Sequence, residues 1–431
     1  MRRLIEAIFR GLGSRLMRAP AEAAISLLDG RAGTTADRLR IALADSHFNE
    51  GDYAAARAAF ASVGDSRHGA KARQMTDWID FKFGDVGRGW PRYPGADFDP
   101  LAHAPGMAPG GAAICVENPN HPVALVTELG LPVWHPGMPT SKPVLVWFNF
   151  KASLGGELLC AKVVKRLEQV HALPMVLACD ARLGDVMRAN FPGCEIVDKE
   201  GDLAGLSGRC SAFLPARDAL ALVVRSQADF APIAGSPFTL PEARTRMGGE
   251  RPQVAISWKT TNRTQGRYRN IPTTELASLL SRFDADFHSA QHGVTPKERR
   301  ILESSLGGRI HFDTIDTKAS VGALAASLAS TDAVVTIDNS VLHIAGTFGI
   351  PAAGLLSVPS YWAWPSKGPA SRWYESVTLM HQQRPGEWAD VLGELAAYLD
   401  RLAGATGSVR APAARLAARG PLPRSPCRGK A

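Results

Sequence analysis

The sequence predicts an α/β protein in which two parallel-sheet domains follow an α-helical region, and three observations lead to this prediction. Short apolar runs rich in β-branched residues alternate with amphipathic segments from residue 142 to residue 402, a pattern typical of right-handed crossovers in parallel sheets. A glycine-containing motif occurs twice ahead of these runs, at Phe48 and at Phe81. A Pro- and Gly-rich stretch over residues 97–111 indicates a linker between the two parts.

The composition narrows the class of protein. The chain has 431 residues, of which 45% are hydrophobic and 21% charged, as in globular proteins of two or three domains. None of its apolar runs approaches the ~18 residues that a membrane span needs. The cysteines show neither a CxxC pair nor regular spacing, so we expect no zinc site, no disulfide framework and a cytoplasmic location. They are Cys115, Cys160, Cys179, Cys194, Cys210 and Cys427.

The net charge of +8 is concentrated at the carboxyl end. From Arg401 onward the chain has seven Lys and Arg residues and no acid, in a stretch rich in Ala, Pro and Gly. We therefore expect residues 404–431 to form a disordered basic tail, and we expect no nucleic-acid partner because the rest of the chain is nearly neutral. Residues 1–18 are basic and apolar at helical spacing, which predicts a first packing helix, with peripheral contact to a membrane surface as the alternative.

Residues 1–96 are predicted to form a tetratricopeptide-like helical region. The repeated motif reads Phe48-x-x-Gly51-Asp52-Tyr53 in its first copy and Phe81-x-x-Gly84-Asp85-Val86 in its second. The offset of thirty-three positions, from 48 to 81, is close to the ~34 residues of a tetratricopeptide unit, whose glycine lies at a helix-helix turn. Two units are few for an independent solenoid, so we expect the region to pack on the next domain.

The two α/β domains are predicted over residues 112–245 and 250–403. In the first we expect strands at 142–150, 174–179 and 195–197, with helices from the turn at 157 to about 170 and at 183–191. In the second we expect strands at 253–258, 287–290, 310–312, 333–337 and 352–356, and helices at 274–282, 296–306, 321–330 and 388–402. Two consecutive doubly wound domains form a cleft where the carboxyl ends of their strands face one another.

Residues 333–351 give the clearest indication of a binding site. An apolar strand is followed by Asp338, Asn339 and Ser340, residue types that cap a helix, and His343 then falls in the first helical turn. A helix N-terminus at the carboxyl end of a parallel strand attracts anions, so we expect a phosphorylated ligand there. The alternative is an ordinary N-cap beside a structural histidine.

A basic segment follows the strand that ends at residue 258. Cations and hydroxyls in this position would hold a diphosphate and neutralise a departing nucleotide, whereas the alternative is a basic surface loop. The segment, which we expect to be a loop, contains Lys259, Thr260, Thr261, Asn262, Arg263, Arg267 and Arg269.

These residues also carry a family resemblance. Asp338, Ser340 and His343, followed by Ile344-Ala345-Gly346, are similar to the donor-site signature Asp-Thr-(Gly or Ala)-x-x-His-Leu-Ala of the bacterial heptosyltransferases, glycosyltransferase family nine, and more closely to relatives with tetratricopeptide repeats. Asn339 stands where the family usually has Thr. The resemblance extends to a donor-binding segment and to a turn near the nucleotide, matched here by Trp258, Arg267, Arg269, Ile271, Pro272 and Gln291.

The turn at Gly155 and Gly156 resembles the family's Gly-x-Gly-Asp turn, which admits the acceptor and whose Asp acts as general base. Gly156 occupies the Asp position here, and the adjacent Glu157 is the carboxylate available in this turn. Glu157 is therefore the candidate base, because sugar transfer to a hydroxyl gains from a base within hydrogen-bond reach. A glutamate that only complements the helix dipole is the alternative.

An aromatic cluster follows the last predicted strand, at Tyr361, Trp362, Trp364, Trp373 and Tyr374. It resembles a similar run in the tetratricopeptide relatives. Such rings either stack on a base or sugar, or pack under the terminal helix.

The resemblance implies a GT-B arrangement of two Rossmann-like domains. It implies a metal-independent glycosyltransferase, without a cofactor, that moves a sugar from a nucleotide-sugar donor to a glycan or protein acceptor, such as a cell envelope polysaccharide. It also implies a cytoplasmic protein, with peripheral contact to the inner membrane as an option. The alternative is a non-catalytic scaffold or nucleotide-sugar sensor that retained the donor cleft and lost the base.

Overall fold

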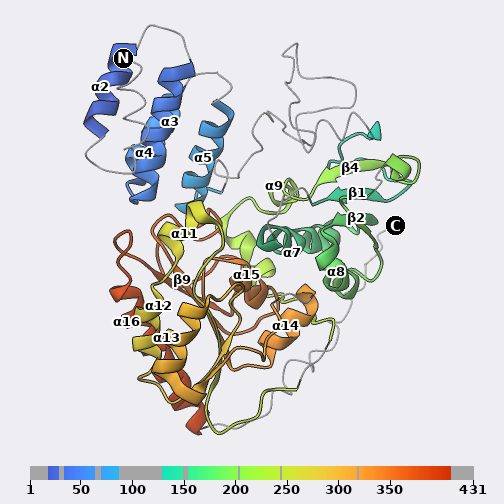
Figure 1. Cartoon of the computed structure of the whole chain (residues 1–431). Helices are drawn as coiled ribbons and strands as arrows, with labels where there is room; N and C mark the ends of the chain where they lie inside the picture. The colour runs from blue at the N-terminus through green and yellow to red at the C-terminus, as the bar shows by residue number, and fades with distance from the viewer. Residues whose placement is uncertain are drawn as a thin grey trace.

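The computed structural model describes residues 18–28, 34–63, 69–86, 129–148, 154–201, 204–242, 245–317 and 320–408. It contains a group of helices at the amino-terminal end, a smaller sheet and a larger sheet (Figure 1). The predicted helix at the start of the chain, the linker at 97–111 and residues 409–431 of the predicted tail lie outside the described residues. Residues 404–408, expected as the start of the disordered tail, are instead the end of a helix, Ala389–Ser408. No helix among the described residues combines the length and the apolar character needed to cross a bilayer.

The helices Thr34–Asn49 and Tyr53–Ala61 form a first hairpin around the left-handed Gly51, and the left-handed Gly84 follows the helix that ends at Lys82. Asp52 caps the second helix of the first hairpin by accepting a hydrogen bond from the Ala55 N–H at 3.2 Å. Gly51 and Gly84, the two glycines of the repeated motif, have φ of +81° and +100°, which only glycine adopts without strain. The tetratricopeptide assignment stays a prediction. The helices are α2 (Arg18–Leu28), α3 (Thr34–Asn49), α4 (Tyr53–Ala61) and α5 (Gly69–Lys82).

The first sheet has four parallel strands in the order β3-β2-β1-β4. Its three predicted strands are present. The fourth strand, β4, was not predicted, because its four residues, AFLP, are too few to show the pattern of a strand. The bounds are β1 (Val144–Trp147), β2 (Met175–Cys179), β3 (Glu195–Asp198) and β4 (Ala212–Pro215), with helices α7 (Leu154–His171), α8 (Gly184–Asn190), α9 (Ala219–Val223) and α10 (Ala231–Ala234).

The second sheet has six parallel strands in the order β10-β9-β8-β5-β6-β7. The five predicted strands are confirmed, and β10 was missed because an irregular stretch of the chain, residues 357–376, separates it from β9. The bounds are β5 (Gln253–Ser257), β6 (Asp286–Ser289), β7 (Ile310–His311), β8 (Ala333–Ile337), β9 (Ala352–Leu356) and β10 (Val377–His381).

The helices of the second domain agree with the prediction except at two places, the terminal helix, which runs to Ser408 and not to 402, and the basic segment after β5. The basic segment expected as a loop forms α11, which begins where the Asn262 side chain accepts a hydrogen bond from the Gln265 N–H at 3.1 Å. The prediction of a continuous loop was therefore wrong. The bounds are α11 (Arg263–Arg269), α12 (Thr273–Leu280), α13 (Pro296–Leu306), α14 (Val321–Ala329), α15 (Ser340–Thr347) and α16 (Ala389–Ser408).

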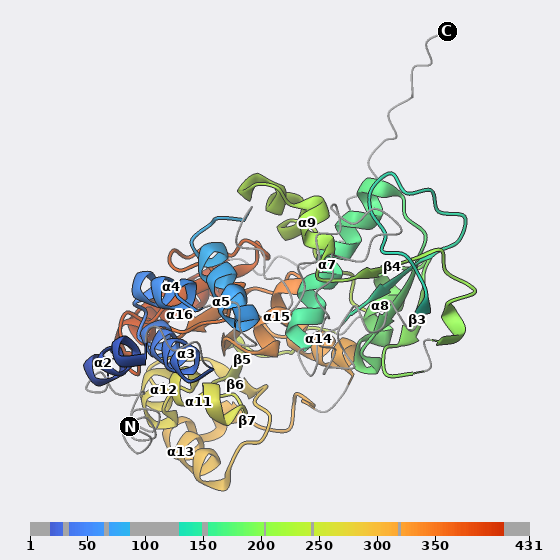
Figure 2. The same cartoon turned by 90° about the horizontal axis from the view of Figure 1, so that it is seen from above.

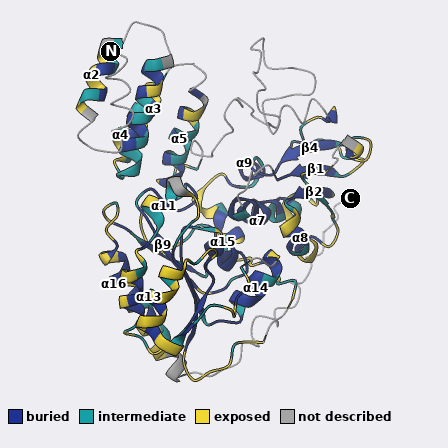
Figure 3. Ribbon diagram, viewed as in Figure 1, coloured by how far each residue is buried: buried dark blue, intermediate teal, exposed yellow. Residues whose placement is uncertain are grey.

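The two sheet domains meet through α7 and α15, which pack against each other between the sheets (Figure 2). One hydrophobic cluster extends from Val144 in β1 through Leu159 in α7 to Leu342 in α15. The outer face of the second sheet has its own cluster beneath α12, α13 and α16. Buried residues follow the strands and α15, while exposed residues gather on the outer helices α13 and α16 (Figure 3).

Candidate functional site

The junction of β8 and α15 lies at the carboxyl edge of the second sheet, and Asn339 fixes its geometry. Asn339 Oδ1 accepts hydrogen bonds from the Val341 N–H at 2.9 Å and from Thr336 Oγ1 at 3.0 Å. Its Nδ2 donates to Ser257 Oγ, at the end of the neighbouring strand β5, at 2.9 Å. Ser340 follows as an exposed residue. The start of α15 is therefore tied to β5, and Ser340 is the exposed residue of its first turn, whereas Val341, Leu342 and His343 are buried.

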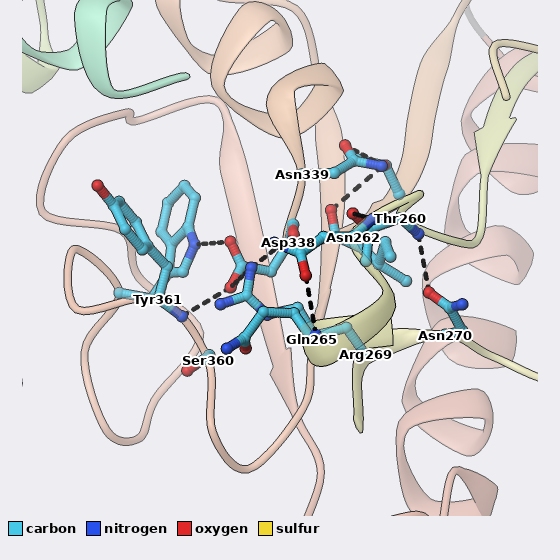
Figure 4. Close-up of polar contacts among 12 residues, drawn as sticks. Thr260, Asn262, Gln265, Arg269, Asn270, Asp338, Asn339, Ser360 and Tyr361 are labelled. Atoms are coloured by element: carbon cyan, nitrogen blue, oxygen red, sulfur yellow. Dashed lines mark hydrogen bonds and ion pairs between the residues drawn. The ribbon is translucent and has the colours of Figure 1, made fainter. Parts of the chain in front are cut away.

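Asp338 lies buried directly before this turn and joins three segments of the second domain. Its Oδ2 accepts a hydrogen bond from the Tyr361 N–H at 2.6 Å, and its Oδ1 accepts one from Trp364 Nε1 at 2.7 Å. Arg269 Nη1 lies 3.4 Å from Oδ2, so α11 is held to the same carboxylate (Figure 4). Burial by itself would raise the pKa of Asp338, but Arg269 and the two hydrogen bonds outweigh it and lower that pKa.

Arg269 has donors left after its contact with Asp338. Its side chain is 16% exposed, and Nη1 lies also 3.4 Å from the backbone oxygen of Asp338. Nε is buried and has no hydrogen-bond partner within the part of the chain that the structure describes. A buried N–H without an acceptor is costly, so an anionic ligand at this edge would gain a charge-assisted hydrogen bond.

His343 is a buried ring in an aromatic cage. Its Nδ1 lies 3.0 Å from the hydroxyl of Tyr374, and it stacks on Trp364 with ring centroids 4.8 Å apart. Burial lowers the pKa of His343 to about 4, opposed by Asp338 and assisted by Arg269. The ring is therefore neutral at pH 7 and packs the helix in place. Trp362, Trp364, Trp373 and Tyr374 are themselves buried, so the structure favours packing for this aromatic cluster.

Gln291 and Thr260 shape the loop after β5. Gln291 Oε1 accepts hydrogen bonds from the backbone N–H groups of Trp258 and Lys259, at 2.9 and 2.8 Å, and from Ser257 Oγ at 3.1 Å. The Thr260 N–H donates to Asn270 Oδ1 at 2.8 Å, as Figure 4 shows. Both predicted donor residues thus lie at the same sheet edge as Asn339.

Arg267 lies on an exposed part of α11, apart from the Asp338 cluster. Its guanidinium lies 4.5 Å from the ring centroid of Tyr268. With residues of α3 and the segment after β10 it lines a hollow of about 710 Å³, whose polar wall includes Asp45, Asn49 and Gln383. The structure therefore separates Arg267 from Arg269, two residues apart in sequence.

The glycine turn of the first domain meets α15. A Cβ on Gly155 would lie 2.5 Å from Cδ2 of His343, so only glycine fits this approach. Glu157, in the same turn of α7, is buried, and its carboxylate contacts other residues of the first domain. Its Oε1 lies 2.5 Å from Lys199 Nζ, and its Oε2 accepts a hydrogen bond from the Asp180 N–H at 3.0 Å. Burial raises the pKa of Glu157, although both contacts oppose the rise.

No family model matches the chain. FlbA of Caulobacter vibrioides is 28% identical over 154 residues, and the match spans 35% of this chain but only a quarter of FlbA, 25% of its length. The solved structures similar to this chain are heptosyltransferases and related glycosyltransferases.

Three of these structures show the extent of the likeness. E. coli ADP-heptose lps heptosyltransferase II has a TM-score of 0.41 at 14% identity, with 60% of this chain and 99% of that chain covered. A family 9 glycosyl transferase from Veillonella parvula has a TM-score of 0.42 at 11% identity, covering 63% and 99%. The dodecameric, iron-containing glycosyltransferase TibC from enterotoxigenic E. coli has a TM-score of 0.38 at 11% identity, covering 64% and 77%.

Several residues of the site gave no signal in the sequence. Lys199, Asn270 and Lys82 contact Glu157, Thr260 and Ser360 respectively. Lys199 and Lys82 lie outside the segments interpreted as binding sites, and Asn270, although next to Arg269 in the basic segment, was given no predicted role. Only the folded chain brings them to their partners. Among the described residues, no group of three or more His, Cys, Asp or Glu side chains is arranged to hold a metal ion.

Proposed function

We propose that this chain is a glycosyltransferase that takes its sugar from a nucleotide-sugar donor bound at the carboxyl edge of the second sheet. One observation carries the proposal: Arg269 contacts Asp338, two residues before the exposed Ser340 that begins α15, and its buried Nε has no acceptor among the described residues. A helix N-terminus and a guanidinium with spare donors suit a diphosphate.

The contacts indicate which residues would bind the donor and which would hold those residues in position. Ser340, the first turn of α15 and Arg269 bind the diphosphate, and Thr260 extends the polar surface toward the rest of the nucleotide. Arg267, which lines the separate hollow beside α3, takes no part in this surface. Asp338, Asn339, Gln291 and His343 hold these groups in position, because their polar atoms are already occupied within the protein. Fixed positive charge aimed at the leaving diphosphate stabilises the negative charge that develops on it, so we propose transfer without a metal ion.

Glu157 remains the proposed base, and Gly155 and Gly156 the proposed acceptor turn. A raised pKa suits a general base near neutral pH. Its ion pair with Lys199 means that an acceptor hydroxyl has to reach a buried carboxylate, and therefore that the turn opens when the acceptor binds. We propose a glycan or a protein as acceptor, and peripheral contact with the inner membrane where that acceptor is membrane-bound.

A nucleotide-sugar sensor is the second candidate. It is favoured by the same ion pair, because residues 154–157 contain no carboxylate other than Glu157 and the structure encloses that group. A sensor would bind donor tightly without turnover.

The test uses pure protein and a panel of nucleotide sugars. A donor that binds the native state raises the melting temperature, and radiolabelled donor reports hydrolysis or transfer. Arg269→Met should weaken donor binding by roughly 10- to 100-fold, as expected for a lost hydrogen bond to a charged group. Arg300→Met, an exposed arginine on α13, is the matched control and should bind as the parent does.

Each outcome decides between the candidates. Transfer or hydrolysis that requires Arg269 supports the enzyme. Binding without turnover, with all donors and with added glycan acceptors, supports the sensor. Failure of every nucleotide sugar and nucleoside diphosphate to bind would refute both.

A further inference from the structure

Both glycine turns of the helical region lie against one irregular segment of the second domain, residues 358–372. At the first turn, the Tyr53 hydroxyl donates to the Val358 oxygen at 2.5 Å, and a Cβ on Gly51 would lie 2.6 Å from Val358 Cγ1. At the second, Arg372 donates to the backbone oxygens of Phe81 and Lys82, at 2.6 and 3.1 Å. The repeated motif therefore serves as a docking surface for this segment.

Lys82 extends this contact into the interior. It ends α5 and is only 1% exposed. Its Nζ donates to Ser360 Oγ at 2.7 Å, to the Trp364 oxygen at 3.3 Å and to the Ser360 oxygen at 3.4 Å. A buried amine is costly unless hydrogen-bonded, so these acceptors fix the position of Lys82 and Lys82 fixes theirs.

The same short segment holds Asp338 from its other side. The residues that donate to the Asp338 carboxylate are Tyr361, which follows Ser360, and Trp364, whose oxygen accepts from Lys82. A continuous series of contacts thus runs from Lys82 through residues 360–364 to Asp338 and on to Arg269. Burial lowers the pKa of Lys82 to about 7, an effect that Asp338 opposes, in keeping with their proximity.

We infer that Lys82 is a positioning residue for the donor site, and that the helical region is part of this site. Lys82 holds residues 360–364 in the conformation that fixes Asp338 and, through Asp338, the guanidinium of Arg269. The inference about donor binding rests on the proposed function, whereas the inference about the segment itself does not.

The experiment compares the full-length chain with Lys82→Met, which keeps the length of the side chain and removes the amine. Lys71→Met is the control, since Lys71 lies on the same helix and makes an exposed ion pair with Asp45. Hydrogen exchange measured by mass spectrometry reports the segment, and equilibrium binding of nucleoside diphosphates and nucleotide sugars reports the site. If Lys82→Met fails to fold, Ser360→Ala, which removes one of the three acceptors, takes its place.

We expect amide exchange in residues 358–366 to become faster in Lys82→Met while the strands of both sheets keep the protection of the parent. We also expect donor affinity to fall on the order of tenfold, by loss of the Arg269 contact. Unchanged exchange in 358–366, or equally faster exchange throughout the chain, would overturn the inference. If the parent binds no nucleotide, the proposed function fails, and the exchange data still decide whether Lys82 holds this segment. If the parent binds and Lys82→Met binds equally well, Lys82 does not position the donor site and the inference is overturned.

Discussion

Gly155 on α7 lies directly against the ring of His343 on α15, so close that a Cβ at position 155 would come within 2.5 Å of Cδ2. This contact joins the proposed acceptor turn to the proposed donor helix. The His343 ring is held in place, because it stacks on Trp364 and its Nδ1 lies 3.0 Å from the hydroxyl of Tyr374.

Gly155→Ala should therefore destabilise the fold by about 1–3 kcal/mol, the usual cost of overpacking a close contact. Donor turnover should fall with it, because α7 and α15 are forced apart. Gly393→Ala is the control: a Cβ there meets nothing within 4 Å, and alanine inside α16 should add up to about 1 kcal/mol of stability. Denaturant unfolding measures both, and equal stability of Gly155→Ala and the parent would contradict the predicted contact.

Asn339→Ala removes the cap of α15 and its bond to Ser257. The lost cap should cost about 1 kcal/mol of unfolding free energy. Because the start of α15 is the proposed diphosphate site, donor affinity should also fall several-fold. Thr295→Ala removes the cap of α13 and should cost similar stability while leaving donor affinity unchanged. Titration calorimetry with the best donor of the panel compares the two variants, and equal affinities would place the ligand elsewhere.

Glu157→Gln tests the proposed base. We expect kcat to fall by roughly 10²–10⁴-fold with donor affinity retained, as for loss of a general base. Lys199→Met leaves the Glu157 carboxylate buried and unpaired, so its pKa should rise further and the pH optimum should move upward. Turnover that survives Glu157→Gln, measured at a temperature where both proteins are folded, would exclude this residue as the base.

The stability of the chain should depend on His343 between pH 4 and 6.5. Burial lowers the pKa of His343 in the folded protein from the ordinary value of 6.5 to about 4, with Asp338 and Arg269 as its charged neighbours. Between these values the unfolded chain binds the proton and the folded one does not, so stability is full above pH 6.5 and falls as the pH drops toward 4. The change is on the order of 2–3 kcal/mol.

Unfolding free energies of the parent and of His343→Gln at pH 7 and pH 4.5 measure this effect. The parent should lose more stability than the variant over this interval. An identical loss in both proteins would show that His343 titrates normally, and thus that its cage opens to water.

The alternation of strands and helices could be predicted from the amino-acid order alone, because apolar β-branched runs and helical spacing are local properties. The capped junction from Asp338 to His343 could be predicted in the same way, since Asn339 is a local cap, as could the pair of glycine turns, since their left-handed backbone requires glycine. The strands β4 and β10 could not, because their short runs become strands only when a neighbouring strand supplies their hydrogen bonds.

Which side chains contact one another could be seen only in the folded chain. Lys199 and Glu157 are 42 positions apart in the chain, and Lys82 and Ser360 are 278 apart. Contacts between residues so far apart produce no recognisable pattern in the sequence, because such pairs form only after two sheets and a helical region have packed. The same packing turned Arg269 toward Asp338 and Arg267 toward the hollow beside α3, although both lie on one short helix, where residues two positions apart do not share a face.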